Sequence, residues 1–289
     1  MKQLSLVLCT LGVWSVAACG TDDDYDDTTT PMVVSAAWLA EHMNDPNVQI
    51  VDALQPPYRT LVQYDAGHIP GAVAFDVSSV RVTVEGTETV LETPEVAAAA
   101  FSAAGLRDDA TIVVYDGNDG VFSARLVWSM RYYGHKDIRL LDGGIPTWIE
   151  SGRPVSTEAA TFPPSDYPVR KVRPDIVVDK QYVLDHLGDP SIVLLDVRSD
   201  EEWNAGYIPG AVHHDWHTAI ENHLIKDPAT LMDMYALPMD KTIVIYCQTG
   251  TRASVMYVVL RELGYKDLRI YDGSWFEWSA SPGVPIEYP

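Results

Sequence analysis

The chain has 289 residues, 47% of them hydrophobic, and carries 41 acidic against 20 basic side chains, a formal net charge of −21. A surface this acidic repels phosphate backbones, so nucleic acid is excluded as an expected partner. The hydrophobic fraction is enough for a sizeable core, and residues 32–289 are long enough for two domains of roughly 100 to 200 residues each.

The first 18 residues have the pattern of an export signal. Lys2 precedes an apolar run over residues 4–18, which is too short to span a membrane. The small residues 16–18 (Val-Ala-Ala) stand directly before Cys19, and this arrangement resembles a bacterial lipobox, in which the cysteine becomes the lipidated first residue of the mature chain. We therefore expect residues 1–18 to be removed and Cys19 to anchor an exported protein in the bacterial cell envelope. An ordinary secretory cleavage near a cysteine is the alternative.

Residues 19–31 are polar and contain five aspartates between positions 22 and 27. A stretch with charges of one sign and no apolar pattern cannot bury surface and stays solvated. We expect an extended tether that holds the globular part off a membrane.

The rest of the chain repeats one order of motifs. Val-Asp-Ala at 51–53 and Ala-Gly-His-Ile-Pro-Gly-Ala-Val at 66–73 return as Leu-Asp-Val at 195–197 and Ala-Gly-Tyr-Ile-Pro-Gly-Ala-Val at 205–212. Residues 111–116 likewise match 242–247, and 133–144 match 263–274. A duplicated domain explains these matches together, with domains at 32–157 and 176–289 and a proline-rich linker at 158–175.

Short apolar runs rich in β-branched residues alternate with helical patterns in each copy. In the second copy we expect strands at 192–195, 242–246 and 268–271, and helices at 178–187, 199–204, 227–235 and 253–263. Runs that are apolar throughout indicate strands buried on both faces. Their alternation with helices predicts an α/β fold, a parallel-sheet sandwich in each domain.

Cys247 stands between the strand predicted at 242–246 and the helix that follows. Loss of Cys9 with the signal and acylation of Cys19 would leave it as the single thiol of the folded part, so no intramolecular disulfide is expected. Ligands gather at the carboxyl ends of strands in open α/β sheets. Backbone N–H groups of a tight loop and the positive end of the helix stabilise a thiolate and would hold a negatively charged persulfide. Gly250 permits the backbone angles of such a loop. A small buried cysteine without chemistry is the alternative.

The duplicated body, the Asp-Val-Arg sequence at 196–198, the Cys247 loop and the motif Tyr-Asp-Gly-Ser-Trp-Phe-Glu-Trp at 271–278 resemble tandem-domain rhodaneses over residues 33–289. The resemblance implies thiosulfate or 3-mercaptopyruvate sulfurtransferase activity with no metal and no cofactor. Cys247 would take a sulfane sulfur as a persulfide and pass it to cyanide or a thiol. The resemblance also implies a catalytically silent first domain, in which Asp116 stands in the place of the cysteine.

The same resemblance assigns roles within the second domain. Cys247 would be the nucleophile, and the Arg252 side chain would bind the sulfonate or carboxylate of the donor. The anion-binding amides would come from Gln248, Thr249, Gly250, Thr251 and Arg252. Two departures leave the donor open: Gln248 stands where mercaptopyruvate enzymes usually have glycine, and Glu202 stands where thiosulfate enzymes have a second arginine.

Two further residues have competing interpretations. Arg198 corresponds to a family arginine near the active site, and an ion pair with Glu202 or another acid is the structural alternative. His68 stands where mercaptopyruvate enzymes have a histidine associated with proton transfer across the domain cleft, and a polar residue at a turn is the alternative. Trp275 and Trp278 are expected to pack the last helix onto the sheet.

Two rival functions use a similar loop. Cysteine-dependent phosphatases place five residues between the cysteine and the arginine, whereas four stand between Cys247 and Arg252, so the loop should be too small for phosphate. A noncatalytic sulfur-relay lipoprotein would keep the fold and the persulfide and differ only in turnover.

Overall fold

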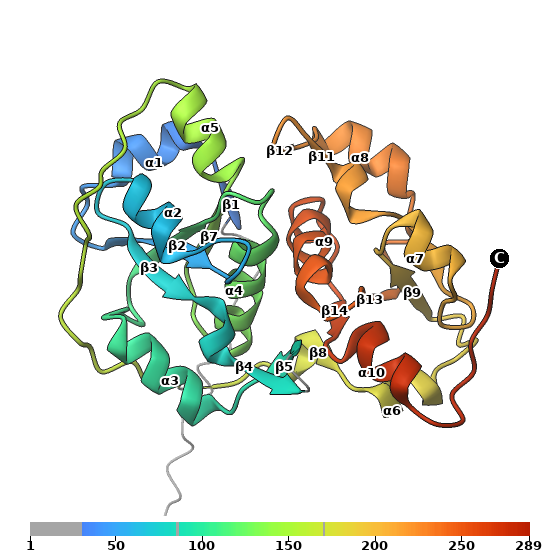
Figure 1. The fold of residues 1–289 in the computed structure, drawn as a ribbon. Helices are drawn as coiled ribbons and strands as arrows, with labels where there is room; N and C mark the ends of the chain where they lie inside the picture. Colours follow the sequence, from blue (N-terminus) through green and yellow to red (C-terminus); the bar gives the residue numbers. More distant parts are fainter. Residues whose placement is uncertain (1–30, 85–86, 170) are drawn as a thin grey trace, which may run out of the picture.

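The computed structural model describes residues 31–289 except 85, 86 and 170. The predicted signal, Cys19 and the tether as far as residue 30 lie outside the described residues. The described part forms two α/β domains that lie side by side (Figure 1). Over these residues, no helix combines the length and the apolar character needed to cross a membrane.

The first domain is built on a parallel sheet of five strands in the order β1-β7-β6-β2-β3. The strands are β1 (Val33–Val34), β2 (Val48–Leu54), β3 (Val73–Asp76), β6 (Thr111–Tyr115) and β7 (Ile138–Leu141). Its helices are α1 (Ala36–His42), α2 (Leu61–Ala66), α3 (Pro94–Ala103), α4 (Val121–Tyr132) and α5 (Gly144–Glu150). After β3, the 3-10 turn η1 (Val77–Val80) leads into an antiparallel hairpin of β4 (Arg81–Val84) and β5 (Thr87–Leu91).

The second domain repeats this plan, with a parallel sheet in the order β10-β9-β13-β14-β8. Its strands are β8 (Val177–Val178), β9 (Ile192–Asp196), β10 (Val212–His213), β13 (Thr242–Tyr246) and β14 (Leu268–Tyr271). Its helices are α6 (Lys180–Asp185), α7 (Asp200–Asn204), α8 (Pro228–Tyr235), α9 (Thr251–Glu262) and α10 (Ser274–Ala280). The 3-10 turns η2 (Pro174–Ile176) and η3 (Trp216–Ala219) and a short hairpin of β11 (Ile220–Glu221) and β12 (Leu224–Ile225) complete it. The predicted α/β class and duplication are confirmed, and two of the predicted strands have the predicted bounds.

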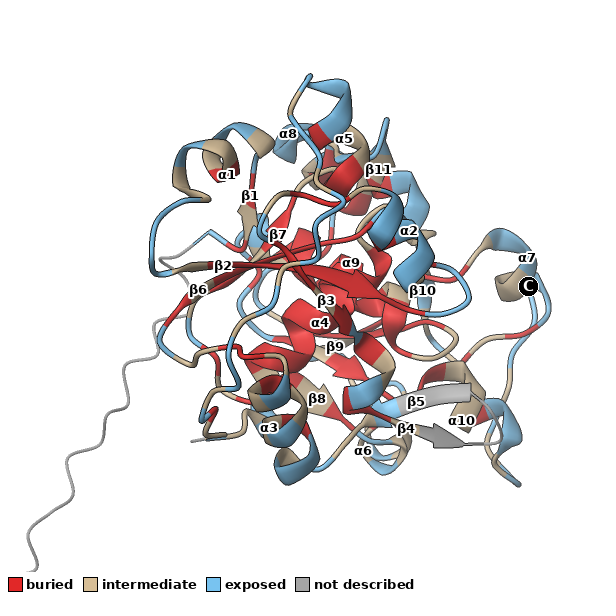
Figure 2. Cartoon of the chain, turned by 60° about the vertical axis from the view of Figure 1, so that its left-hand side comes forward, coloured by how far each residue is buried: buried red, intermediate tan, exposed pale blue. Residues whose placement is uncertain are grey.

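Helices α4 and α9 pack against each other between the two sheets (Figure 1). Figure 2 shows both as largely buried, in contrast to the exposed outer helices. A helix enclosed on all sides has no solvent face to reserve for polar residues, which is why both sequences are apolar around much of their circumference. The domain interface is thus part of the hydrophobic core.

Several buried contacts occur twice, once in each domain. The hydroxyl of Tyr115 accepts from Ile69 N at 3.0 Å, and that of Tyr246 accepts from Ile208 N at 3.2 Å. Trp278, whose packing role was predicted, is fully buried and donates to a carbonyl of the C-terminal segment. These repeats show that the two domains share side-chain packing as well as topology.

The described residues of the segment 158–173, which exclude 170, form no helix or strand but are fixed to the first domain. Tyr167 is buried in the core, and its hydroxyl lies 2.7 Å from His135 Nδ1. The predicted linker therefore packs along one domain instead of spanning free space.

Each hairpin reaches across to the other domain. Leu91 N at the end of β5 donates to Asp272 Oδ2 at 2.8 Å, and Ile225 N at the end of β12 donates to Asp142 Oδ1 at 3.0 Å. Arg125 of α4 adds a buried ion pair with Asp272 at 2.5 Å. These contacts fix the first domain beside the loop that follows β13.

Candidate active site

The loop that contains Cys247 joins β13, the central strand of its sheet, to α9. Gly250 precedes the helix with φ 79°, a left-handed angle that glycine adopts without strain. The Cys247 N–H donates to Ser274 Oγ at 3.3 Å, and its carbonyl accepts from Trp275 N at 3.0 Å. The first two residues of α10 therefore fix the backbone of Cys247.

The corresponding loop of the first domain has the same plan. Asp116 directly follows β6, Gly120 precedes α4 with φ 80°, and the Asp116 carbonyl accepts from Ile145 N at 3.0 Å. This loop is one residue longer, since Gly120 is four positions after Asp116 and Gly250 is three after Cys247. Aligned on the two glycines, Phe122 corresponds to Arg252 and Ser123 to Ala253.

The Asp116 carboxylate is enclosed by the amides of its own loop and helix. Oδ1 accepts from Asn118 N at 2.7 Å and Gly120 N at 3.1 Å, and Oδ2 accepts from Phe122 N and Ser123 N, both at 2.8 Å. The Ser123 hydroxyl adds a contact at 3.0 Å, and Asp116 is 1% exposed. A strand-to-helix loop of this shape therefore holds one negative charge by several converging N–H groups.

The amides of the Cys247 loop have no such internal anion. Within the part of the chain that the structure describes, the N–H groups of residues 248–253 donate to no protein acceptor. Cys247 ends in a single sulfur where Asp116 has two oxygens. The loop thus offers unpaired donors next to a thiol, an arrangement suited to a negatively charged sulfur.

Cys247 is 1% exposed and lies close to Arg252. Burial disfavours the Arg252 charge, but hydrogen bonds with Glu202 and the nearby Cys247 outweigh it and raise the pKa of Arg252 above its ordinary value. The predicted cation therefore stands beside the predicted nucleophile.

Arg252 also makes a bidentate ion pair that the sequence did not predict. Its Nη1 and Nη2 donate to the two carboxylate oxygens of Glu202 at 2.6 and 2.7 Å. Burial of Glu202 opposes ionisation, but hydrogen bonds from Arg252 and Ser199 lower its pKa to about 2. The fork that would bind a donor anion is already held by an internal carboxylate at neutral pH.

Arg198 has the structural role that was its alternative interpretation. It is 1% exposed, pairs with Asp196 through Nη2 at 2.6 Å, and lies over the Trp275 ring at 4.3 Å. The first domain has a matching buried pair, Arg59 with Asp52. Because the pair persists where no catalysis is expected, it stabilises the fold. The partner is Asp196 and not Glu202, and the substrate-binding role of Arg198 stays a prediction.

His68 belongs to the packing of the first domain. Its Nδ1 lies 2.8 Å from the carbonyl of Tyr64 and its Nε2 lies 3.0 Å from that of Glu158, and the ring is fully buried. Tyr207, its counterpart, forms a similar backbone bridge with Glu287. The structure therefore assigns His68 to fastening the linker, and it does not bring the imidazole to the Cys247 loop.

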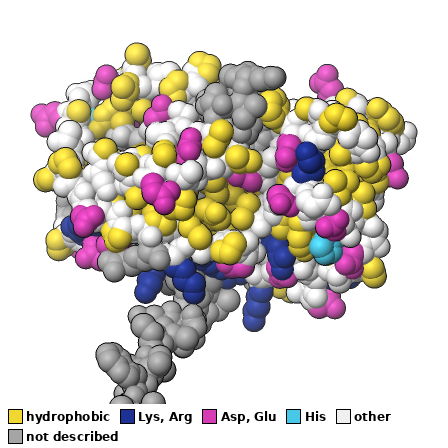
Figure 3. All heavy atoms as spheres, turned by 90° about the horizontal axis from the view of Figure 1, so that it is seen from below, with side chains coloured by type: hydrophobic (Ala, Val, Ile, Leu, Met, Phe, Trp, Pro, Cys, Tyr) yellow, Lys and Arg dark blue, Asp and Glu magenta, His cyan; other side chains and the backbone are white. Residues whose placement is uncertain are grey.

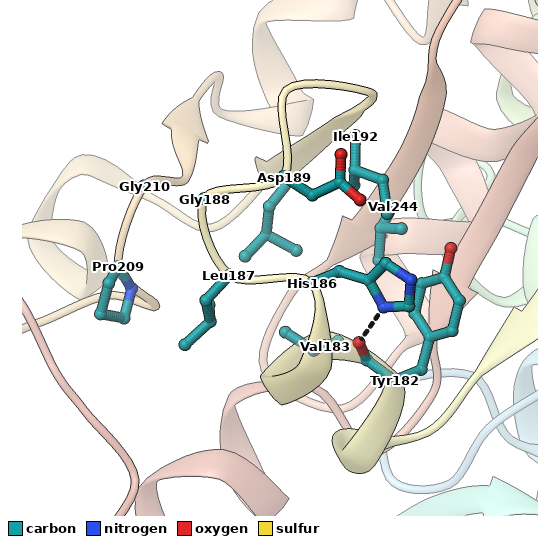
Figure 4. A pocket seen from close by; sticks show the side chains of 11 residues that line it. Tyr182, Val183, His186, Leu187, Gly188, Asp189, Ile192, Pro209, Gly210 and Val244 are labelled. Carbon is teal, nitrogen blue, oxygen red and sulfur yellow. Dashed lines mark hydrogen bonds between the residues drawn. The ribbon is translucent and has the colours of Figure 1, made fainter.

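Two of the cavities near the second domain lie beside α6 and not at the Cys247 loop. One of about 160 Å³ lies between the end of α6 and Pro209-Gly210 (Figure 4). The other, of about 550 Å³, lies between the β4–β5 hairpin, α6 and α10, on the side seen in Figure 3, where acidic side chains are scattered among apolar ones. Neither lining includes residues 247–252.

Comparison with known proteins agrees with this geometry. The family description "Rhodanese-like domain" matches residues 35–151 and 179–281. The chain is 33% identical to the sulfur carrier protein TtuD of Thermus thermophilus over 88% of this chain and 96% of that one. It is 29% identical to the 3-mercaptopyruvate sulfurtransferase of Escherichia coli K12 over 90% and 99%.

A solved structure gives the same result. The crystal structure of SseA from Escherichia coli, described as a 3-mercaptopyruvate sulfotransferase, matches with a TM-score of 0.77 and 29% identity over 85% of this chain and 99% of that chain. The matches cover both domains, and the chain belongs to the rhodanese family.

Proposed function

We propose that this chain is a sulfurtransferase that carries a sulfane sulfur on Cys247 as a persulfide and delivers it to a thiol or to cyanide. The observation that supports this most strongly is the unpaired amide loop around the thiol, next to a twin loop whose amides hold the Asp116 carboxylate. The loop thus has N–H donors for an anion, and the Cys247 sulfur is the group that can carry the negative charge.

The reaction has two balanced steps. The Cys247 thiolate attacks the outer sulfur of thiosulfate, the sulfur–sulfur bond of thiosulfate breaks, and sulfite leaves with the bonding electrons. An acceptor thiolate or cyanide then attacks the outer persulfide sulfur, and Cys247 leaves as a thiolate. With 3-mercaptopyruvate, the thiolate attacks its sulfur, the carbon–sulfur bond breaks, and pyruvate leaves as an enolate that takes a proton from water.

The loop amides stabilise the negative charge that the sulfur bears before, during and after each step. Donors already oriented toward a developing charge do not have to reorganise as it forms. We assign Gln248, Thr249, Gly250, Thr251 and Arg252 to this loop, and the alignment with Ser123 adds the amide of Ala253.

Donor choice depends on the Arg252–Glu202 pair. A sulfonate or carboxylate has to compete with Glu202 for the guanidinium fork. A bulkier or less charged donor, such as a persulfide on another protein, would avoid that competition. The relative named a sulfur carrier protein favours this relay as the second candidate function.

We also retain the proposal that residues 1–18 are a signal peptide and that Cys19 bears a lipid in the bacterial cell envelope. It rests on the sequence pattern alone. Mass analysis of Cys19 in the membrane fraction of a producing bacterium would test it.

The function is tested by incubating the purified full chain with thiosulfate and, separately, with 3-mercaptopyruvate, then adding cyanide and following thiocyanate. We expect catalytic thiocyanate production with at least one donor and none with Cys247→Ser. A stable persulfide without turnover would support the relay instead. Phosphate release from an aryl phosphate without sulfur transfer would contradict both.

A further inference from the structure

We propose that Arg81, in the silent first domain, is a positioning residue for the Cys247 loop of the second domain. Its guanidinium orients the Gly250 N–H toward the reacting sulfur. The inference rests on the proposed function and identifies which residue of the first domain that function requires.

Arg81 makes two contacts across the domain interface. It is the first residue of β4, at the lower seam between the domains (Figure 1), and is 4% exposed. Its Nη2 donates to the Thr249 carbonyl at 2.7 Å and its Nη1 donates to Thr251 Oγ1 at 3.0 Å. Both acceptors flank Gly250, so one rigid fork holds the loop on both sides of its glycine.

The contact with the Thr249 carbonyl fixes the direction of an amide. In a planar trans peptide, the C=O and the following N–H point in opposite directions. Because Arg81 holds the Thr249 oxygen outward, the Gly250 N–H of the same peptide faces the inside of the loop. In the silent loop the corresponding Gly120 N–H does point inward, to Asp116 Oδ1 at 3.1 Å.

The position of Arg81 is not shared by the second copy. Arg81 directly follows η1, and the residue that directly follows η3 is Ile220. The hairpin that Ile220 begins reaches the silent loop, where His223 Nδ1 lies 2.6 Å from Asp119. Each hairpin thus contacts the other domain of the same chain, but only the β4–β5 hairpin presents an arginine to the loop that it contacts.

The two loops differ in a way that explains this asymmetry. The Asp116 carboxylate organises its own amides, so its loop requires no external support. A thiol is a weak acceptor and cannot gather amides before it becomes charged. The Cys247 loop therefore depends on an external contact to keep its donors oriented between turnovers, and Arg81 provides it.

Replacement of Arg81 by methionine tests this in the full chain with the donor that the wild type uses. Loss of one well-placed donor costs roughly 100- to 1,000-fold in kcat. Because the Gly250 N–H remains but is no longer held in direction, we expect a smaller fall in kcat of about 10- to 100-fold, while KM stays within about two-fold because the Arg252 site is intact. Arg81→Lys should recover part of kcat, since one amine can still reach the Thr249 carbonyl. His223→Ala removes a different cross-domain contact and should leave kcat unchanged.

The outcomes separate the two proposals. An inactive wild type would overturn the proposed sulfurtransferase function and, with it, the role of Arg81 in turnover. An active wild type with an equally active Arg81→Met, or a loss of kcat equal to that of His223→Ala, would overturn the role of Arg81 alone. If Arg81→Met does not fold, Arg81→Gln decides, because its shorter side chain cannot span the Thr249 carbonyl and Thr251 Oγ1. A folded Arg81→Gln with wild-type kcat would overturn the role of Arg81.

Discussion

The loops after β6 and β13 share a backbone plan and differ in what occupies it. In the first, the Asp116 carboxylate accepts from four backbone N–H groups and a hydroxyl, so the loop already holds an anion of its own. In the second, the thiol of Cys247 leaves the amides of residues 248–253 without a protein acceptor in the described chain. The comparison supports the proposal that the second loop binds an anion where the first holds its own carboxylate. Whether it stabilises the fold or supports chemistry depends on one side chain.

The largest effect should come from giving the second loop the side chain of the first. Cys247→Asp removes the sulfur and should reduce turnover to less than about one thousandth of wild type, as loss of a nucleophile does. The new carboxylate should also accept hydrogen bonds from the unpaired amides. The free energy of unfolding should then be about 1 to 3 kcal/mol higher than that of Cys247→Ser. Chemical denaturation of the two variants measures the difference.

Cys247→Ser is the matched control, since it removes the same sulfur without adding a charge. If Cys247→Asp proved less stable than Cys247→Ser, the amides would face away from the side chain. That result would break the comparison between the loops.

The second effect concerns the loop after β6. Asp116→Asn keeps the size of the side chain but turns an amide NH₂ toward donors that need an acceptor, and it should destabilise the protein by about 2 to 4 kcal/mol. Asp109→Asn, on an exposed side chain, should change stability by less than about 0.5 kcal/mol. An Asp116→Asn variant as stable as wild type in denaturant would show that the carboxylate is not what organises this loop.

The smallest effect concerns the competition for Arg252. Glu202→Gln retains the capping box of α7 but removes the charge paired with the guanidinium. An ion pair of this exposure is worth about 1 kcal/mol, so KM for an anionic donor should fall about five-fold with kcat unchanged. Glu201→Gln, on the exposed neighbour in the same helix, is the control and should leave KM as it is.

The pH dependence sharpens this third test. The pKa of Glu202 is lowered to about 2, so the carboxylate is ionised across neutral and mildly acidic pH and loses its charge only as pH falls through that value. The KM ratio of wild type to Glu202→Gln should therefore stay constant from about pH 8 to pH 5. If this KM ratio began to fall near pH 5.5, Glu202 would titrate as an ordinary carboxyl group that is not stabilised by Arg252.

Patterns along the chain were enough to predict the fold. The apolar runs at 242–246 and 268–271 became β13 and β14 with the same bounds, because strands buried on both faces leave a continuous signature. The duplication was visible as repeated motifs, and it also located Asp116 opposite Cys247. The predicted helices at 227–235 and 199–204 each begin one residue early, because the sequence pattern does not separate the N-caps Asp227 and Ser199 from the helical residues.

Partners of charged residues could not be predicted in the same way. The sequence offers Glu202 as a partner for Arg198. In the structure Glu202 pairs with Arg252, 50 positions away, and Arg198 pairs with Asp196. Arg81 gave no signal at all, because its contacts join residues 168 and 170 positions apart in two domains. His68 matched a family position, yet its neighbours Tyr64 and Glu158 fix it inside one domain. Such pairings depend on how the finished domains meet.

The central claim is that the amides of the second loop hold a charged sulfur as those of the first hold a carboxylate. A crystal structure of the full chain after loading with a sulfane-sulfur donor tests it most directly. We predict one extra sulfur on Cys247, in contact with the N–H groups of Gly250, Arg252 and Ala253. An outer sulfur directed away from these groups, or extra sulfur that remains on the protein in Cys247→Ser, would contradict it.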